Sequence, residues 1–378
     1  MLGAWGRIGC IGFGGPPTHI ALLRALCVDR RRWLDKQEFE DAVAVCNLLP
    51  GPASTQLAIY CAWRVRGRAG ALVGGVAFIV PGLLLILALA ALFLAGSPPR
   101  WVAGAGAGAG AAVAAVAVHA GWTLVPASWA RTQERAGQVR WLGYLAAGAA
   151  AAATVGPWLV LVLAAGGAVE LVAQHLTSGG ASVRAVVPAP LLASLGGVIG
   201  GGVLLSLGWV AFKVGALSYG GGFVIIPLMQ SDAVGRYHWL SAGQFLNAVA
   251  LGQITPGPVV QTVAAVGYAA AGVGGGLLAA VVAFTPSFAF VLLGGAQFDR
   301  LRGDKRARGF LDGAGPAAIG AIFGSALPLA RALQQPWQYA VLAAAILLLA
   351  LRRGVVASLL VAGAAGILVA LAGGPIPH

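Results

Sequence analysis

The stretch N-L-L-P-G-P-A-S-T-Q, residues 47–56, interrupts an apolar run with a glycine between two prolines. Proline lacks a backbone N–H and its ring clashes with the preceding helical turn, so this tripeptide is a poor continuation of a helix. A second stretch, Q-I-T-P-G-P-V-V-Q-T, residues 253–262, has the same tripeptide in the same kind of setting. The recurrence predicts two broken helices in related parts of the fold.

The composition of the whole chain is that of a membrane protein. Of its 378 residues, 59% are hydrophobic and 9% are charged, whereas about a quarter of the residues in a soluble domain are charged. A helix needs about 20 apolar residues to cross about 30 Å of hydrocarbon. Long, largely apolar runs recur along the chain, at Ala69–Ala95, Val102–Val125, Val273–Gly295 and Val355–Leu371. We therefore predict an all-α polytopic membrane protein in a lipid bilayer.

The net charge of +13 does not indicate nucleic-acid binding. The basic residues lie in short loops between apolar runs, where the charges that set membrane orientation are found. The four cysteines, Cys10, Cys27, Cys46 and Cys61, show no metal-ligand or redox spacing. The sequence also has no Walker motif for ATP binding. We therefore expect no cofactor and no metal.

The second half of the chain repeats the first. An offset of 206 positions aligns the halves without a gap from about residue 7 to 78, and it places Gly14 on Gly220 and residues 50–52 on residues 256–258. Roughly a third of the aligned positions are identical, against about one in ten expected by chance in a chain rich in Ala and Gly. The predicted division has three parts: a first repeat at 1–176, a more polar linker at 177–190 and a second repeat at 191–378.

The basic loops indicate that the two repeats lie in the membrane with opposite orientations, because cytoplasmic loops collect Lys and Arg. The loops at 64–68 and 131–140 are basic in the first repeat, and their aligned positions carry no charge. The reverse holds for the loop at 300–308, whose aligned stretch at 94–102 carries Arg100 as its one charge. Inverted repeats are common among secondary transporters. The apolar runs make about thirteen membrane segments, and the first broken segment of each repeat fits either a full span or a re-entrant hairpin.

The breaks place irregular backbone inside the membrane, where it survives only if protein or a wet cavity surrounds it. Each repeat has two breaks, at 12–17 and 50–52 in the first repeat and at 218–222 and 256–258 in the second. A helix that starts after a break offers free N–H groups and about half a positive charge, which suits an anion. The candidate substrate-binding residues of the breaks are Gly14, Gly15, Pro50, Gly51, Pro52, Gly220, Gly221, Pro256, Gly257 and Pro258.

Polar side chains beside the P-G-P breaks are further candidates for substrate binding. The amides of Asn47, Gln56, Gln253 and Gln261 can donate hydrogen bonds to the oxygens of an oxyanion. The alternative is structural, with these side chains capping the broken helices or joining them to neighbouring helices.

Two cations in apolar segments occupy equivalent positions. Arg7 aligns with Lys213, and a cation present in both repeats suggests attraction of an anion, because a charge at the bilayer centre costs about 2.5–3.5 kcal/mol. The alternative is that both side chains extend to the membrane interface. His19 aligns with Ile225, so any role of His19 in binding or proton coupling would belong to the first repeat alone. Glu170 lies near the end of a predicted span, and we expect it at the interface.

Five stretches of the sequence resemble one known family. They are F-G-G-P at 13–16, R-R-R-W-L at 30–34, L-P-G-P-A-S-T-Q at 49–56, F-K-V-G-A-L-S-Y-G-G-G at 212–222 and T-P-G-P at 255–258. These are similar to the chromate ion transporter family in its long form, with two homologous halves in one chain. The resemblance implies a bacterial inner-membrane protein that exports chromate, with thirteen membrane segments and halves of opposite orientation. Gly222 stands where the first repeat has a proline, so it carries over only as backbone.

The sequence therefore favours a secondary active transporter that exports chromate, a tetrahedral dianion, by alternating access. A carrier of sulfate or another oxyanion is an alternative, because chromate and sulfate share charge and shape. A membrane-embedded enzyme acting on lipid phosphates is a further alternative, but its chemistry needs acids, His or Ser placed together. No such cluster recurs in both repeats. The sequence is compatible with a homodimer.

Overall fold

A computed structural model of the chain describes residues 1–49, 51–94, 98–132, 134–154, 159–177, 202–218, 223–294 and 305–377. Every regular element within these residues is helical. The first repeat contains α1 (Leu2–Ile11), α2 (Pro16–Arg24), α3 (Lys36–Leu48), α4 (Ala53–Phe93), α5 (Arg100–Ala111), α6 (Val113–Trp129), α7 (Arg135–Thr154) and α8 (Leu159–Thr177). The second repeat contains α10 (Val203–Leu217), α11 (Ile225–Gln230), α12 (Ala242–Ile254), α13 (Thr262–Gly294), α15 (Lys305–Arg331), α16 (Pro336–Ala350) and α17 (Val355–Leu371). Short turns complete the list: the π-helices η1 (Ala25–Arg30) and η4 (Ser231–Arg236) and the 3₁₀-helix η5 (Val259–Gln261).

The described helices are those of a multi-pass membrane protein. Five of them are long and apolar enough to cross a bilayer: Ala53–Phe93, Arg100–Trp129, Leu159–Leu176, Val259–Gly294 and Arg308–Arg331. Large apolar side chains such as Leu84 and Leu293 are 61% and 78% exposed, as expected where a helix faces lipid. The prediction of an all-helical membrane protein is confirmed. Most of the predicted linker lies in residues 178–201, outside the described residues.

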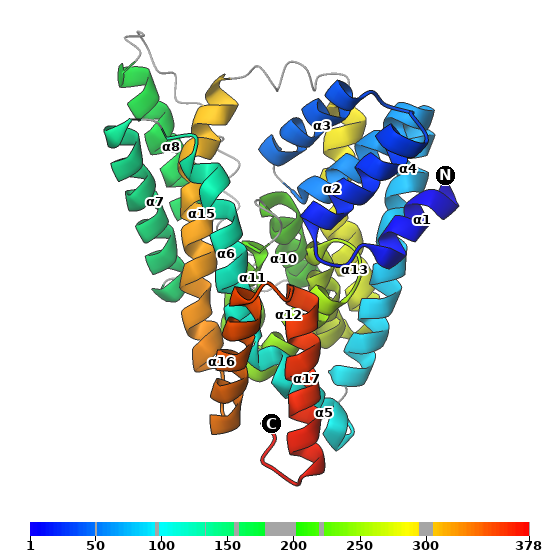
Figure 1. The fold of residues 1–378 in the computed structure, drawn as a ribbon, viewed down its shortest axis with the longest axis vertical. Coiled ribbons are helices and arrows are strands. Elements are labelled where there is room, and N and C mark those ends of the chain that lie inside the picture. The colour runs from blue at the N-terminus through cyan, green and yellow to red at the C-terminus, as the bar shows by residue number, and fades with distance from the viewer. Residues whose placement is uncertain are drawn as a thin grey trace.

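The helices lie in two lateral groups, with two further helices at the lower end of the molecule. Figure 1 shows α7, α8 and α15 on one side, α1 to α4 with α13 on the other, and α16 and α17 at the lower end. Glycines let these helices approach closely, as is usual for helix pairs in membranes. A methyl group at Gly148 of α7 would lie 1.9 Å from the carbonyl oxygen of Ala317 in α15. A methyl group at Gly104 of α5 would lie 2.5 Å from the carbonyl oxygen of Gly366 in α17.

The two repeats have the same succession of elements up to the P-G-P breaks. The π-helices η1 and η4 occupy equivalent positions, and each is followed by a residue with positive φ, Arg32 at 49° and His238 at 52°. The next helices, α3 and α12, both have 13 residues. Each starts at a capping side chain: Asp35 accepts a hydrogen bond from the N–H of Glu38, and Ser241 forms a capping box with Gln244.

The repeats shift by one residue after the breaks, so the alignment without a gap is wrong there. α4 begins directly after Pro52, whereas η5 stands between Pro258 and α13. The kinks at Arg66–Gly67 in α4 and Ala271–Gly272 in α13 are consequently 205 positions apart instead of 206. A 3₁₀ turn rises about 2.0 Å per residue and an α-helix about 1.5 Å. Three residues of η5 therefore cover about the length of four α-helical residues.

Candidate functional site

The break after α1 lies against the P-G-P break of the second repeat. Gly12, where α1 ends, accepts a hydrogen bond of 3.0 Å from the backbone N–H of Gly257. A methyl group at Gly15 would lie 3.9 Å from Cγ2 of Val259. Residues more than 240 positions apart in the sequence therefore form one piece of irregular backbone.

The P-G-P break of the first repeat lies against the end of α10. A methyl group at Gly51 would lie 3.4 Å from the carbonyl oxygen of Gly215 and 3.4 Å from Oγ of Ser287 in α13. Gly215 stands three positions before Ser218, where S-Y-G-G-G begins. One contact thus joins a break of the first repeat to a break of the second, and the other joins the first P-G-P break to the end of α10. Three predicted site residues lie outside the described part of the chain: Pro50, Gly220 and Gly221.

The break glycines have backbone conformations that favour glycine. The φ angles are 98° at Gly14, 77° at Gly15, 117° at Gly51 and 100° at Gly257, and side chains with a Cβ rarely adopt such values. Pro52 and Pro258 follow in extended conformation and serve as the N-caps of α4 and η5. The carbonyl oxygen of Pro256 lies close to α4, because a methyl group at Gly82 would be 2.1 Å from it.

Gln56 and Gln261 are fully buried and lie at the break of their own repeat. Nε2 of Gln56 would be 2.6 Å from a methyl group at Gly51, and Nε2 of Gln261 would be 3.1 Å from one at Gly257. Gln261 also donates a hydrogen bond of 2.8 Å from Nε2 to the carbonyl oxygen of Ile79 in α4. Gln261 therefore joins the broken helix to the neighbouring helix α4, as the structural alternative predicts, while its side chain lies beside the break.

Asn47 and Gln253 align in sequence but lie in different surroundings. Gln253, in the last turn of α12, is 7% exposed, and its Nε2 has no hydrogen-bond partner among the described residues. Asn47, in the last turn of α3, is exposed. The structure therefore places the amide of Gln253 inside the protein, near the break, and leaves the amide of Asn47 on the surface.

Several buried polar atoms near the breaks have no hydrogen-bond partner within the described ranges: Thr55 Oγ1, Ser218 Oγ, Gln253 Nε2, Gln261 Oε1 and Ser287 Oγ. An unpaired buried polar group costs about 1–3 kcal/mol, and native proteins keep few of them. A bound ligand or ordered water would supply the missing partners.

Ser218 and Ser287 were not among the residues predicted from sequence. Both hydroxyls are 0% exposed and can donate a hydrogen bond. Ser218 could have been recognised because it opens S-Y-G-G-G. Ser287 had no such signal, because it lies inside a long apolar helix and only packing brings it to Gly51.

His19 links the first break to the start of α4. Its ring is fully buried, with Nε2 2.9 Å from the carbonyl oxygen of Gly12 and Nδ1 3.2 Å from Oγ of Ser54. A carbonyl oxygen only accepts hydrogen bonds, so Nε2 carries the proton and, in the neutral ring, Nδ1 accepts from the Ser54 hydroxyl. The ring also meets Phe78 edge-on at 5.0 Å between centroids. His19 therefore holds in place the carbonyl group that binds Gly257.

The two aligned cations have different partners. Lys213 forms an ion pair with Asp232 of η4, and its ammonium group lies 5.8 Å from the ring centroid of Trp209. Arg7 is exposed and has no ion pair within the described part of the chain. The expectation that both cations add positive field at the site therefore needs correction for Lys213, because Asp232 offsets its charge.

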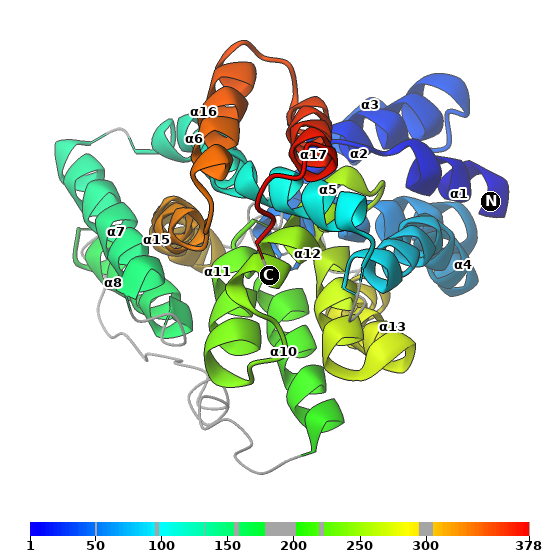
Figure 2. The same ribbon diagram turned by 90° about the horizontal axis from the view of Figure 1, so that it is seen from below.

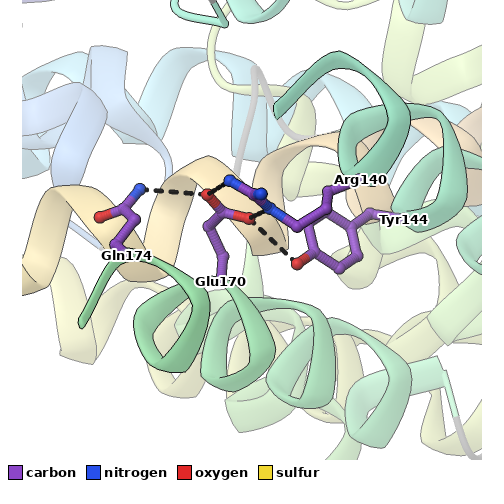
Figure 3. A network of polar contacts seen from close by, with 4 residues as sticks. All are labelled: Arg140, Tyr144, Glu170 and Gln174. Atoms are coloured by element: carbon purple, nitrogen blue, oxygen red, sulfur yellow. Dashed lines mark hydrogen bonds and ion pairs between the residues drawn. The ribbon is translucent and has the colours of Figure 1, made fainter. Parts of the chain in front are cut away.

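A second polar network lies on α7 and α8, away from the breaks. Figure 3 shows the carboxylate of Glu170 between the side chains of Arg140, Tyr144 and Gln174. Arg140 donates two hydrogen bonds to it, of 2.8 and 3.0 Å, Tyr144 donates one of 3.0 Å and Gln174 one of 3.2 Å. Glu170 is 7% exposed. The interfacial position of Glu170 stays a prediction, and the structure adds that its carboxylate is enclosed by protein and ties α7 to α8.

The described residues contain no group of three or more His, Cys, Asp or Glu side chains that could hold a metal ion. The fold and the breaks instead define a class, a multi-pass helical membrane protein with interrupted helices, the arrangement in which many transporters build their substrate sites. The family model of the chromate transporter matches residues 1–171 and 205–369. The chain belongs to the chromate transporter family.

Several curated proteins are similar to this chain over most of its length. A chromate transport protein of Cupriavidus metallidurans is 32% identical over 328 residues, which cover 86% of this chain and 80% of that protein. A chromate transport protein of Pseudomonas aeruginosa is 31% identical over 86% of this chain and 79% of its own length. A probable chromate transport protein of Synechococcus elongatus is 29% identical over 86% of this chain and 82% of its own length. No solved structure matches the chain.

Proposed function

We propose that this chain is a secondary active transporter that exports chromate across the bacterial inner membrane by alternating access. The observation that carries the proposal is that breaks from the two repeats meet where buried polar atoms have no partner among the described residues. The relatives are named chromate transport proteins, which supports chromate as the substrate and a transporter in place of an enzyme.

The anion would be held by dipoles and hydroxyls instead of by buried cations. The described residues of the breaks include no Asp or Glu that would repel a dianion. α4 begins directly after the break at 50–52, and α2 begins at Pro16 within the break at 12–17. Each N-terminus contributes about half a positive charge. Hydrogen bonds to the oxygens of the anion can come from the hydroxyls of Thr55, Ser218 and Ser287 and from the amide of Gln253. These groups have no hydrogen-bond partner among the described residues. A site without full opposing charges can also release its anion, as transport requires.

The proposal includes two homologous halves of opposite orientation, divided at 1–176, 177–190 and 191–378. The two matches to the family model fall on either side of the linker, which supports the division. In Figure 1, α2 and α3 lie in the upper half of the molecule and α11 and α12 in the lower half. The pair Arg131–Asp312, at 3.0 Å, joins two regions that the charge pattern places in the cytoplasm. Both observations support the inversion and the thirteen-segment path.

Alternating access would use the two contacts between repeats. The Gly12–Gly257 contact and the Gly51–Gly215 contact each join one repeat to the other. If one repeat rocks against the other, one contact can open while the other stays closed. A proton gradient or a counter-anion would supply the energy. Sulfate, which has the same charge and shape as chromate, is the alternative substrate. The proposal also includes a homodimer, which a measurement of the oligomeric state would test.

Uptake of labelled chromate into everted membrane vesicles tests the proposal, because export from a cell appears as uptake into an everted vesicle. The decisive variant is Gly257→Ala, and its matched control is Gly272→Ala. Both glycines have positive φ, 100° and 63°, but a methyl group at Gly272 would meet no atom within 4 Å. Both variants therefore place a Cβ at a positive φ, and only Gly257 lies at the break.

We expect gradient-driven uptake in the wild type, a loss of at least about tenfold in Gly257→Ala and near-normal uptake in Gly272→Ala. A tenfold loss of uptake corresponds to about 1.4 kcal/mol. This is less than the free energy of about 1.5–3 kcal/mol contributed by one hydrogen bond to a charged group. Excess unlabelled sulfate should lower the uptake of labelled chromate if the site recognises only charge and shape. Normal uptake by Gly257→Ala, or none by well-inserted wild type, would overturn the proposal.

A further inference from the structure

A cavity of about 750 Å³ lies at the end of the molecule where α5, α12 and α16 begin. Figure 2 shows the C-terminal segment running between α5, α12, α16 and α17 at this end. The polar side chains that line the cavity are Arg100, Gln244, Asn247, Gln335 and Gln338. None of the described lining residues is acidic. The cavity is distinct from the helix breaks, since no described residue of the breaks lines it.

The charged group and helix ends around this cavity favour a positive electrostatic potential. Arg100 brings a full charge at the first position of α5. Gly243 and Gln244 lie in the first turn of α12, and Gln335 is the N-cap of α16. Each of these N-termini adds about half a positive charge. Three helix ends and one guanidinium therefore face a space without a described carboxylate, which favours an anion.

The cavity also contains donors that an anion can use. Arg100 donates from Nη2 to the carbonyl oxygen of Gly374 at 2.8 Å, and its guanidinium has five N–H groups in all. The side chain of Asn247 has no hydrogen bond to any described residue, and it lies beside two glycines of α5. A methyl group at Gly106 would be 2.9 Å from its Nδ2, and one at Gly110 3.1 Å from its Oδ1. The missing side chains of these glycines make room for the amide.

α12 runs from the cavity toward the break at 256–258. Asn247 lines the cavity, and α12 ends seven positions later at Ile254, which is about 10 Å at 1.5 Å per helical residue. Pro256 follows two positions beyond that end. The lining segments near residues 98–100, 243–247, 332–338 and 375–377 are those that the charge pattern places outside the cytoplasm. Four separate segments assigned to one side of the membrane thus converge on one space.

We propose that this cavity is a second anion site, an outer vestibule that binds a free tetrahedral oxyanion through Arg100 and Asn247. Its place on the export route rests on the proposed function, whereas the binding itself does not. An oxyanion leaving the break would be attracted along α12 and would compete with the Gly374 carbonyl for the guanidinium of Arg100. Such charge-assisted pairs with arginine are strong and directional.

Equilibrium binding of radiolabelled sulfate to the purified full chain in neutral detergent at low ionic strength tests the vestibule. We expect two sites in the wild type. Arg100→Gln should weaken one of them about tenfold or more and leave the other unchanged. Asn247→Ala should weaken the same site less. The control is Arg331→Gln, which removes an exposed arginine next to the lining residue Ala332 but outside the lining itself.

The outcomes separate the vestibule from the break. A single site that Gly257→Ala abolishes and Arg100→Gln leaves unchanged would overturn the vestibule and leave the proposed function standing. If one site weakens in Arg100→Gln and the other keeps its affinity in Gly257→Ala, the result would support the vestibule and contradict anion binding at the break. A lipid phosphate offers the same chemistry as a free oxyanion. Displacement of the Arg100-dependent sulfate by small amounts of phosphatidylglycerol would identify a lipid headgroup as the occupant and overturn the free-anion site.

Discussion

The break at Gly51 and the break at Gly257 share a tripeptide and a left-handed glycine, but their neighbours differ. Beside Gly257, α4 comes so close that a methyl group at Gly82 would lie 2.1 Å from the carbonyl oxygen of Pro256. The equivalent position beside Gly51 holds Ser287, whose hydroxyl has no partner among the described residues. The second break is closed by backbone packing, whereas the first faces a free donor. Duplicated backbone has thus diverged in its side chains.

The aligned cations show the same divergence. Lys213 is bound to Asp232, which is 3% exposed, whereas Arg7 is exposed. The position aligned with Asp232 in the first repeat is Leu26. The aligned cation therefore has an ion-pair partner in the second repeat, and in the first repeat it has none among the described residues.

The largest expected effect on stability comes from breaking the Lys213–Asp232 pair. Lys213→Gln leaves a buried carboxylate uncompensated and should lower the free energy of unfolding by about 3–5 kcal/mol. Arg7→Gln should change it little, because an exposed charge loses little on removal. Unfolding of the purified protein by a denaturing detergent would measure both. The double variant Lys213→Gln/Asp232→Asn should recover most of the lost stability. Equal losses of stability in Lys213→Gln and Arg7→Gln would contradict the prediction, because they would show that the two cations are equivalent.

A smaller contrast is expected between Gly82→Ala and Ser287→Ala. The added methyl group at Gly82 meets backbone at 2.1 Å, and overpacking of this kind costs about 1–3 kcal/mol. Ser287→Ala removes an unpaired buried hydroxyl, so stability should stay level or rise, while the apparent KM for chromate should rise. Melting temperature and vesicle uptake would separate the two effects. A Ser287→Ala variant with unchanged KM would exclude Ser287 from anion binding.

The smallest effects are expected at the caps of α3 and α12. Asp35→Ala removes one hydrogen bond of 2.7 Å to the N–H of Glu38, and Ser241→Ala removes the hydroxyl that accepts from Gln244 at 3.2 Å. Each should lower the free energy of unfolding by about 1 kcal/mol. The same detergent titration would measure them, with Asp35→Gly and Ser241→Gly as controls that should cost only a few tenths of a kcal/mol. A loss above about 2 kcal/mol at either position would mean that more than the cap is lost.

Much of the fold could be predicted from the sequence because the relevant signals are local. Apolar length determines which segments can cross a bilayer, and a proline-flanked glycine ends a helix whatever surrounds it. The ends of α3 and α12 accordingly lie just before residues 50–52 and 256–258. The shift of one residue after the breaks was missed, although the spacing of Gln56 from Gly51 and of Gln261 from Gly257 already differs by one.

Sequence by itself determined that this protein is a helical membrane protein of the chromate transporter family, with a duplicated pair of helix breaks, because hydropathy and backbone restriction act residue by residue. Only the tertiary structure decided which breaks meet, as in the Gly12–Gly257 hydrogen bond. It also decided that Asp232 offsets Lys213 and that Ser287 reaches Gly51. Such contacts join residues far apart in the chain, so they depend on how whole helices pack, and no short stretch of sequence encodes that packing.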